Sequence, residues 1–213
     1  MNTCVAKTQD GVAEGSLLFD VLPSHAGICP TGWTRREYAL DESLAVAFNE
    51  AAQRHAVDGA TILCAALALV ESRFTGAQTI LASRADAHGE KQLPIEVPRV
   101  GTRNAWLQAF CSSLDTASPV HGSTAWMVSD DLYPADVMPT CDDVISTIKS
   151  RWHVDASATK LEVAFHAPLN TAAINLLYAA VVRALRELCV PSDSDLSLID
   201  VVDPDERRRM LLE

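Results

Sequence analysis

The stretch QRHAVDGAT, residues 53–61, holds the residue types in this chain that are best suited to catalysis. It places His55 three positions before Asp58, and Gly59 follows directly. An imidazole titrates near neutral pH and can act as a general base, while a nearby carboxylate can hold the ring in the required orientation. The stretch therefore raises the question whether His55 removes a proton from an attacking amine or hydroxyl.

Hydrophobic periodicity places this stretch at a junction between two helices. After Asp41, apolar residues recur at helical spacing and predict a first helix over about 42–55, with one face formed by Leu44, Phe48, Ala51, Ala52 and His55. ATILCAALALVESRF is apolar on nearly every side and predicts a buried second helix near 60–74, capped by Thr61 or Asp58 and ended by Gly76. His55 then lies on a last helical turn, where the macrodipole favours the imidazolium form.

The other segments predict a sheet packed with helices. Strands are expected near 78–83, 124–129 and 160–166, with a short strand at REYAL and a proline-broken edge strand at KQLPIEVPRV. Further helices are expected near 104–114 and 170–189, LSLIDVV is expected to be extended, and Pro204 is expected to begin a closing helix. The fold class is therefore α/β, with a mixed β-sheet in a single domain that follows a flexible leader, residues 1–15.

Other candidate chemistry is weak. No two of the six cysteines form a CxxC pair, which disfavours both a zinc site and a disulfide scaffold. They lie at positions 4, 29, 64, 111, 141 and 189. We expect Cys64 and Cys189 to be core residues because they lie in apolar helical runs. The adjacent pairs Asp130–Asp131 and Asp142–Asp143 match no calcium loop, and we expect them to be solvated.

The remaining histidines also lack supporting residues. His153 follows Trp152 and is expected to stack or to lie in a turn, and solvated positions are expected for His25, His88, His121 and His166. The chain has no GxSxG elbow and no phosphate-binding glycine loop. We expect no catalytic residue, no metal and no cofactor.

Charge and hydropathy restrict the partners. The 213 residues are 48% hydrophobic and carry a formal net charge of -11, which disfavours a nucleic acid. The one arginine cluster, Arg207–Arg209, follows Asp203, Asp205 and Glu206. No run approaches the roughly 20 apolar residues that span a bilayer, and MNTCVAKTQDG lacks the apolar core of a signal peptide. We therefore expect a cytoplasmic protein without a membrane partner.

The order of elements carries a family resemblance. TKLEVAFHAP, NTAAINLLYAAVVRALRELC, LSLIDVV and DERRRMLLE resemble the C-terminal end of condensation domains of nonribosomal peptide synthetases. The run from YALDESLAVAF to QTILASR, residues 38–84, resembles the opening helix, buried second helix and following strand of the same domain's C-terminal lobe. The resemblance covers about residues 16–213 and implies a single chloramphenicol-acetyltransferase-like lobe, with the N-terminal lobe absent.

This resemblance implies that His55 is not catalytic. In the family, the reactive HHxxxDG motif belongs to the N-terminal lobe, and the reaction centre lies in a tunnel between the two lobes. Here two residues separate His55 from Asp58 where the motif has three, residue 54 is an arginine, and the chain contains no adjacent histidine pair.

The resemblance implies a non-catalytic, truncated condensation-like domain at the N-terminus of a nonribosomal peptide synthetase. Such a lobe would be a scaffold or interaction module for the adjacent adenylation domain, with residues 203–213 as the start of the linker. We expect the contact to use Leu196, Leu198, Ile199, Val201, Met210, Leu211 and Leu212. The segment LLFDVLPSHAGICPTGW is expected to fold back as a lid over the face that the absent N-terminal lobe leaves uncovered. The apolar residues of this lid would be Leu17, Leu18, Phe19, Val21, Leu22 and Trp33.

Two other functions stay open from the sequence. The chain could be half of a condensation or acyltransferase enzyme that an HHxxxDG-bearing lobe completes in trans. It could instead recruit a tailoring enzyme or a carrier protein, in which case its acidic surface would meet a basic patch on that partner.

Overall fold

The computed structural model describes residues 34–86, 89–114, 126–129, 150–165 and 171–203. In this part of the chain, six strands form one mixed sheet in the order β1-β6-β5-β4-β2-β3. The strands are β1 (Thr34–Ala39), β2 (Thr79–Asp86), β3 (Gly89–Glu96), β4 (Trp126–Ser129), β5 (Ser150–Val154) and β6 (Lys160–Phe165). Pairing is parallel for β2–β4 and β4–β5 and antiparallel for the other neighbours. The α/β class with a mixed sheet is confirmed.

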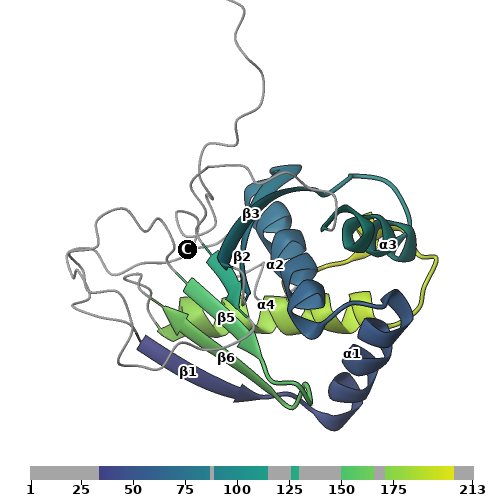
Figure 1. Ribbon diagram of the computed structural model, residues 1–213. Helices are drawn as coiled ribbons and strands as arrows, with labels where there is room; N and C mark the ends of the chain where they lie inside the picture. Colours follow the sequence, from purple (N-terminus) through teal and green to yellow (C-terminus); the bar gives the residue numbers. More distant parts are fainter. Residues whose placement is uncertain (1–33, 87–88, 115–125, 130–149, 166–170, 204–213) are drawn as a thin grey trace, which may run out of the picture.

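Four α-helices are described: α1 (Glu42–His55), α2 (Gly59–Thr75), α3 (Arg103–Leu114) and α4 (Thr171–Cys189). Figure 1 shows α2 and α4 crossing beside the sheet, with α1 and α3 at the same end of the molecule. α2 packs against β2, β4 and β5 and against α4. Every residue of α2 from Ala60 to Ser72 is buried, as its all-round apolar sequence predicts.

Capping residues define where α1 and α2 begin and end. The Asp41 side chain accepts a hydrogen bond from the Leu44 amide at 2.9 Å and begins α1. α1 ends at His55, and Ala56 follows in the left-handed conformation with φ 55°. Asp58 begins α2 by accepting from the Thr61 amide, so Asp58 is the capping residue of the two alternatives. Gly76 ends α2 with φ 76°, as predicted.

The strand β5 was not predicted, and the expectation that His153 stacks or lies in a turn was wrong. Ser150, Trp152 and Val154 point to the helix side of the sheet and are buried, whereas Arg151 and His153 alternate to the other side. The Trp152 indole donates to the Ser150 hydroxyl at 2.9 Å, which satisfies both polar groups in the core. The proline-containing strand β3 lies at the sheet edge, as predicted.

The prediction for LSLIDVV needs a correction at its start. Leu196–Leu198 form a short 3-10 helix, η2, because the Asp195 carboxylate accepts from the Ser197 amide and favours a turn there. The Leu196 amide also donates to the Gly101 carbonyl at 2.7 Å, and Thr102 pairs with Asp195. These bonds fix the segment against the loop that precedes α3.

Several predictions fall outside the described residues: the leader 1–15, the lid residues, the two aspartate pairs, the linker helix after Pro204, and His25, His88, His121 and His166. Within the described ranges, no single helix is long and apolar enough to cross a membrane. α1 and α2 reach that length and composition only together, and they are bent by 104°.

Candidate functional site

The Asp58 carboxylate is bound by groups other than His55. Its Oδ1 accepts from the Thr61 amide and from the Thr61 hydroxyl, both at 2.8 Å, and its Oδ2 is paired with Arg84 of β2. Arg84 also donates to the Thr61 hydroxyl at 2.8 Å. Asp58 therefore caps α2 and connects it to the sheet, which is a structural role.

The electrostatics of the junction agree with this role. Burial alone would raise the pKa of Asp58, but hydrogen bonds from Thr61 and the Arg84 guanidinium hold the pKa below its usual range. Burial lowers the pKa of His55, and the positive charge of Arg54 lowers it further. The expectation that the macrodipole favours imidazolium at His55 was therefore wrong, because desolvation and the neighbouring guanidinium outweigh it. The Nε2 atom of His55 is buried and has no hydrogen-bond partner among the described residues.

The three described cysteines lie in the core. Cys64, Cys111 and Cys189 are buried, which confirms the core positions expected for Cys64 and Cys189. Burial raises the pKa of Cys111 to about 11 and the pKa of Cys189 to about 12. Because the thiolate is the reactive form, the Cys111 and Cys189 side chains stay protonated and unreactive near neutral pH.

A polar cluster that the sequence did not reveal lies across β1, β6 and β5. His153 of β5 stands opposite Glu162 of β6, and its Nδ1 is 3.0 Å from the Ser129 carbonyl oxygen, to which it donates. Arg35 of β1 donates to Glu162 at 2.5 Å. The signal for this cluster was the alternation in SRWHV, which places Arg151 and His153 on the same face. In the described part of the chain, no group of His, Cys, Asp or Glu could hold a metal ion.

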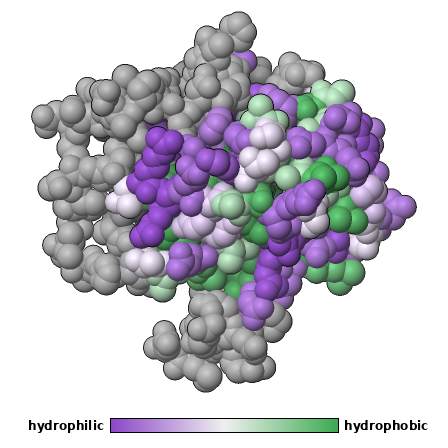
Figure 2. Space-filling view, turned by 90° about the horizontal axis from the view of Figure 1, so that it is seen from below, coloured by the Kyte–Doolittle hydropathy of each residue, from purple (hydrophilic) through white to green (hydrophobic). Residues whose placement is uncertain are grey.

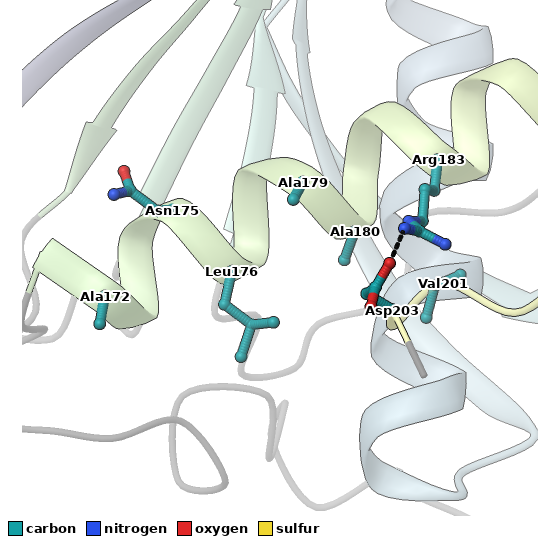
Figure 3. A pocket seen from close by; sticks show the side chains of 8 residues that line it. All are labelled: Ala172, Asn175, Leu176, Ala179, Ala180, Arg183, Val201 and Asp203. Atoms are coloured by element: carbon teal, nitrogen blue, oxygen red, sulfur yellow. Dashed lines mark hydrogen bonds and ion pairs between the residues drawn. The ribbon is translucent and has the colours of Figure 1, made fainter. Parts of the chain in front are cut away.

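The outward side of α4 carries a hollow of about 330 Å³. Figure 3 shows Ala172, Leu176 and Ala180 on one side of the helix and Val201 opposite them. The hollow ends at an ion pair between Arg183 of α4 and Asp203, whose nitrogen and oxygen are 2.6 Å apart.

A second hollow of about 380 Å³ lies between α4 and the start of α1 and shares Ala179 and Arg183 with the first. Its wall includes Tyr178, which stacks on Tyr38 of β1 with ring centroids 3.8 Å apart. Arg186 of α4 pairs with Asp41 at its margin. Both hollows combine small apolar side chains with ion pairs.

Hydrophobic residues appear as separate patches between hydrophilic ones on the underside of the molecule (Figure 2). Of the large apolar side chains in the described ranges, those that are exposed are Val46, Val100, Val190 and Leu198. Leu198 is 69% exposed and Val100 is 76% exposed. Their segments are joined where the Leu196 amide donates to Gly101, so these two residues lie on neighbouring stretches of chain.

The structure separates the residues predicted to contact a partner. Leu196, Ile199 and Val201 are at most 2% exposed and belong to the core of this lobe. Val201 also lines the hollow beside α4. A partner contact through these three residues stays a prediction. Leu198 is exposed, whereas Met210, Leu211 and Leu212 lie outside the described residues. Among the described residues of this set, Leu198 is therefore the exposed one.

Comparison with known proteins connects this geometry to a known fold. No protein-family model and no curated protein sequence matches the chain. The condensation domain of the monacolin K polyketide synthase MokA matches with a TM-score of 0.59 and 13% identity, covering 87% of this chain and 54% of that one. The first condensation domain of the CDA synthetase matches with a TM-score of 0.57 and 17% identity, covering 79% of this chain and 48% of that one.

A third solved structure is the complex of the X-domain and OxyB from teicoplanin biosynthesis, which matches with a TM-score of 0.61 and 14% identity. The match covers 92% of this chain and 54% of that one. The chain thus spans about half the length of the structures that it matches. It has the fold of a single lobe of a condensation domain, as found in nonribosomal peptide synthetases and polyketide synthases.

Proposed function

We propose that this chain is the C-terminal lobe of a condensation-like domain in a cytoplasmic nonribosomal peptide synthetase. It does not catalyse condensation, and it is a scaffold that contacts an adjacent adenylation domain. The observation that carries the proposal is coverage: the chain corresponds to 54% of one matched condensation domain and 48% of another. A reaction centre placed between two lobes needs residues from both.

The geometry around His55 supports the absence of catalysis by this lobe. A general base must reach its proton within hydrogen-bonding distance, and the carboxylate nearest in sequence, Asp58, is already bound by Thr61 and Arg84. The described cysteines are buried, and burial raises the pKa of Cys111 and of Cys189. The contact with a partner is assigned to Leu198 and to Met210, Leu211 and Leu212.

Deletion of residues 1–213 from the parent synthetase tests the scaffold. The proposal predicts that the adenylation domain loses solubility or activity without changing its amino-acid choice. A matched parent protein carrying His55→Ala should retain its activity. An adenylation domain that expresses and activates its amino acid equally well without this lobe would contradict the scaffold role.

A second candidate is recruitment of a separate protein. The X-domain match favours it, because that structure is a complex with OxyB. In this case the chain would bind a tailoring enzyme or a carrier protein through a basic patch on that partner. A pull-down with the isolated chain separates the candidates: capture of a free tailoring enzyme or carrier protein, with no affinity for the adenylation domain, favours recruitment.

Completion in trans is a further alternative, in which another chain supplies an HHxxxDG-bearing lobe. Mixing this chain with such a lobe and with aminoacyl and peptidyl thioesters tests it. Amide formation that requires both chains would support completion in trans and contradict the non-catalytic proposal.

A further inference from the structure

β1 is one of the two outer strands of the described sheet, and among the described strands it pairs only with β6 (Figure 1). The other outer strand, β3, contains Pro94 in register with Leu81. A proline is tolerated in a strand where its nitrogen faces away from the neighbouring strand, so Pro94 leaves a missing donor on the outer side of β3. The sequence of β1, TRREYA, contains no proline. Of the two edges, β1 is therefore the one that can form a continuous ladder with an added strand.

The Leu40 amide shows which backbone groups of β1 face outward. It donates to the Thr159 carbonyl at 2.8 Å, on the side of β6. Backbone groups alternate in direction along an antiparallel strand, so the odd-numbered residues of β1 turn their amides and carbonyls away from β6. These residues are Arg35, Glu37 and Ala39. An added strand therefore meets a row of donors and acceptors along this edge.

Arg36 and Tyr38 place their side chains on the helix side of this edge. The Tyr38 ring stacks on Tyr178 of α4, and Arg36 points to the same side because side chains alternate along a strand. Arg36 is exposed and has no ion-pair partner among the described residues, whereas Arg35 pairs with Glu162. Facing side chains come closest in the non-hydrogen-bonded pairs of an antiparallel ladder, which Arg36 and Tyr38 would form. A carboxylate opposite Arg36 would therefore pair with its guanidinium.

The hollow between α4 and the start of α1 continues this row of positions. Leu40 follows Tyr38 by two residues and lines the hollow of about 380 Å³ together with Ala39 and Val182. A residue of the added strand opposite Leu40 lies two positions from the residue opposite Tyr38, so its side chain points to the same side. The hollow can therefore accept an apolar side chain at this position.

We propose that the outer edge of β1 binds an extended acidic segment of another protein as an antiparallel strand. The segment places an acidic residue opposite Arg36, a β-branched residue opposite Tyr38 and an apolar residue opposite Leu40. Its sequence therefore reads apolar-x-apolar-x-acid toward its C-terminus. Main-chain hydrogen bonds supply the affinity, and the alternate side chains supply the specificity. This surface does not include Leu198, so the inference does not rest on the proposed function.

A synthetic peptide, acetyl-TLTVTET-amide, tests the site by isothermal titration calorimetry with the 213-residue chain. Binding should be saturable, and Arg36→Glu should weaken it at least about fivefold because an attractive cross-strand pair becomes repulsive. Arg99→Glu reverses the charge of an exposed residue outside β1 and should leave the affinity unchanged. A peptide with lysine in place of glutamate should bind the Arg36→Glu variant more tightly than it binds the unmodified chain.

Methylation of the peptide backbone tests strand addition itself. The threonine opposite Glu37 exchanges hydrogen bonds with the outer edge of β1, whereas the amide of the valine opposite Tyr38 faces away from it. N-methylation of that threonine should weaken binding at least about tenfold, because it removes a donor and leaves the facing carbonyl without a partner. N-methylation of the valine is the matched control and should leave binding unchanged.

The absence of saturable binding to the unmodified chain would overturn the proposal. Equal effects of the two methylations would overturn strand addition, and equal effects of Arg36→Glu and Arg99→Glu would overturn the acidic character of the partner. Dimerisation of the chain that excludes the peptide would assign the edge to a second copy and overturn the proposed occupant. None of these results bears on the scaffold role, which is assigned to other residues and to an adenylation domain.

Discussion

Asp58 and Arg84 form an ion pair across the junction between α2 and β2, with the Arg84 side chain 18% exposed and the Asp58 side chain 50% exposed. This pair uses the one carboxylate that follows His55 closely in sequence. The stretch whose residue types are best suited to catalysis is therefore a helix cap that is fixed to the sheet.

Replacement of Asp58 by alanine should destabilise the fold. The N-terminus of α2 loses its cap and Arg84 loses the carboxylate with which it pairs, so the free energy of unfolding should fall by about 1–2 kcal/mol. Urea unfolding followed by circular dichroism measures this change. Asp193→Ala, at an exposed loop position, is the control and should stay within about 0.5 kcal/mol of the unmodified protein. A loss at Asp58 no larger than at Asp193 would show that the cap contributes little.

His55 should make stability depend on pH. Its pKa in the folded protein lies below the ordinary value of 6.5, so the unfolded chain binds more protons as the pH falls below that value. The stabilisation is therefore present above pH 6.5 and is lost as the pH falls from there through the lower folded pKa. His55→Gln should reduce the difference in urea midpoint between about pH 7.5 and about pH 5.5. An unchanged difference would contradict this assignment.

The buried thiols should be unreactive in the folded protein. A variant with Cys4, Cys29 and Cys141 replaced by serine retains the three buried cysteines. Since their thiols are inaccessible and the pKa values of Cys111 and Cys189 are raised to about 11 and about 12, Ellman's reagent should react at about pH 8 only after denaturation. Rapid release of the chromophore by the native variant would count against the burial of these residues.

Replacement of Leu196 and of Leu198 by alanine should lower the free energy of unfolding by very different amounts, although only one residue separates the two positions. Leu196 is fully buried, so Leu196→Ala should lower the free energy of unfolding by about 2–5 kcal/mol. Leu198 is 69% exposed, and Leu198→Ala should change it by less than about 0.5 kcal/mol. Chemical denaturation of both variants gives the comparison. Similar losses at the two positions would mean that the short 3-10 turn does not separate core from surface.

Strong periodicity made much of the fold predictable from sequence. The helices predicted near 42–55 and 170–189 and the strand predicted near 160–166 were found because their apolar residues recur at one clear period. The helix near 60–74 and the strand near 78–83 were found because each is a continuous apolar run bounded by turn residues. The strand β5 was missed because it has five residues, two of them the polar Arg151 and His153. Its pairing with β4 and β6 depends on contacts distant in sequence, which local patterns do not reveal.

The candidate contact surface was only partly predictable. The sequence of LSLIDVV shows five apolar residues, but the division into core and surface depends on the turn at Asp195 and on the bond from Leu196 to Gly101. The hollow on α4 was also not predictable, because its lining combines that helix with Val201 and Asp203. The lowered pKa of His55 was missed because the sequence does not show how far the end of α1 is buried.

The most direct measurement of the scaffold role is the affinity of this chain for the adjacent adenylation domain, determined by isothermal titration calorimetry. The proposed contact predicts saturable binding that Leu198→Asp weakens at least about tenfold, because a charge would enter the apolar contact. Val46→Asp, which changes another exposed apolar residue on α1, should bind with the affinity of the unmodified chain. The absence of binding by the unmodified chain, or equal binding by the two variants, would contradict the account.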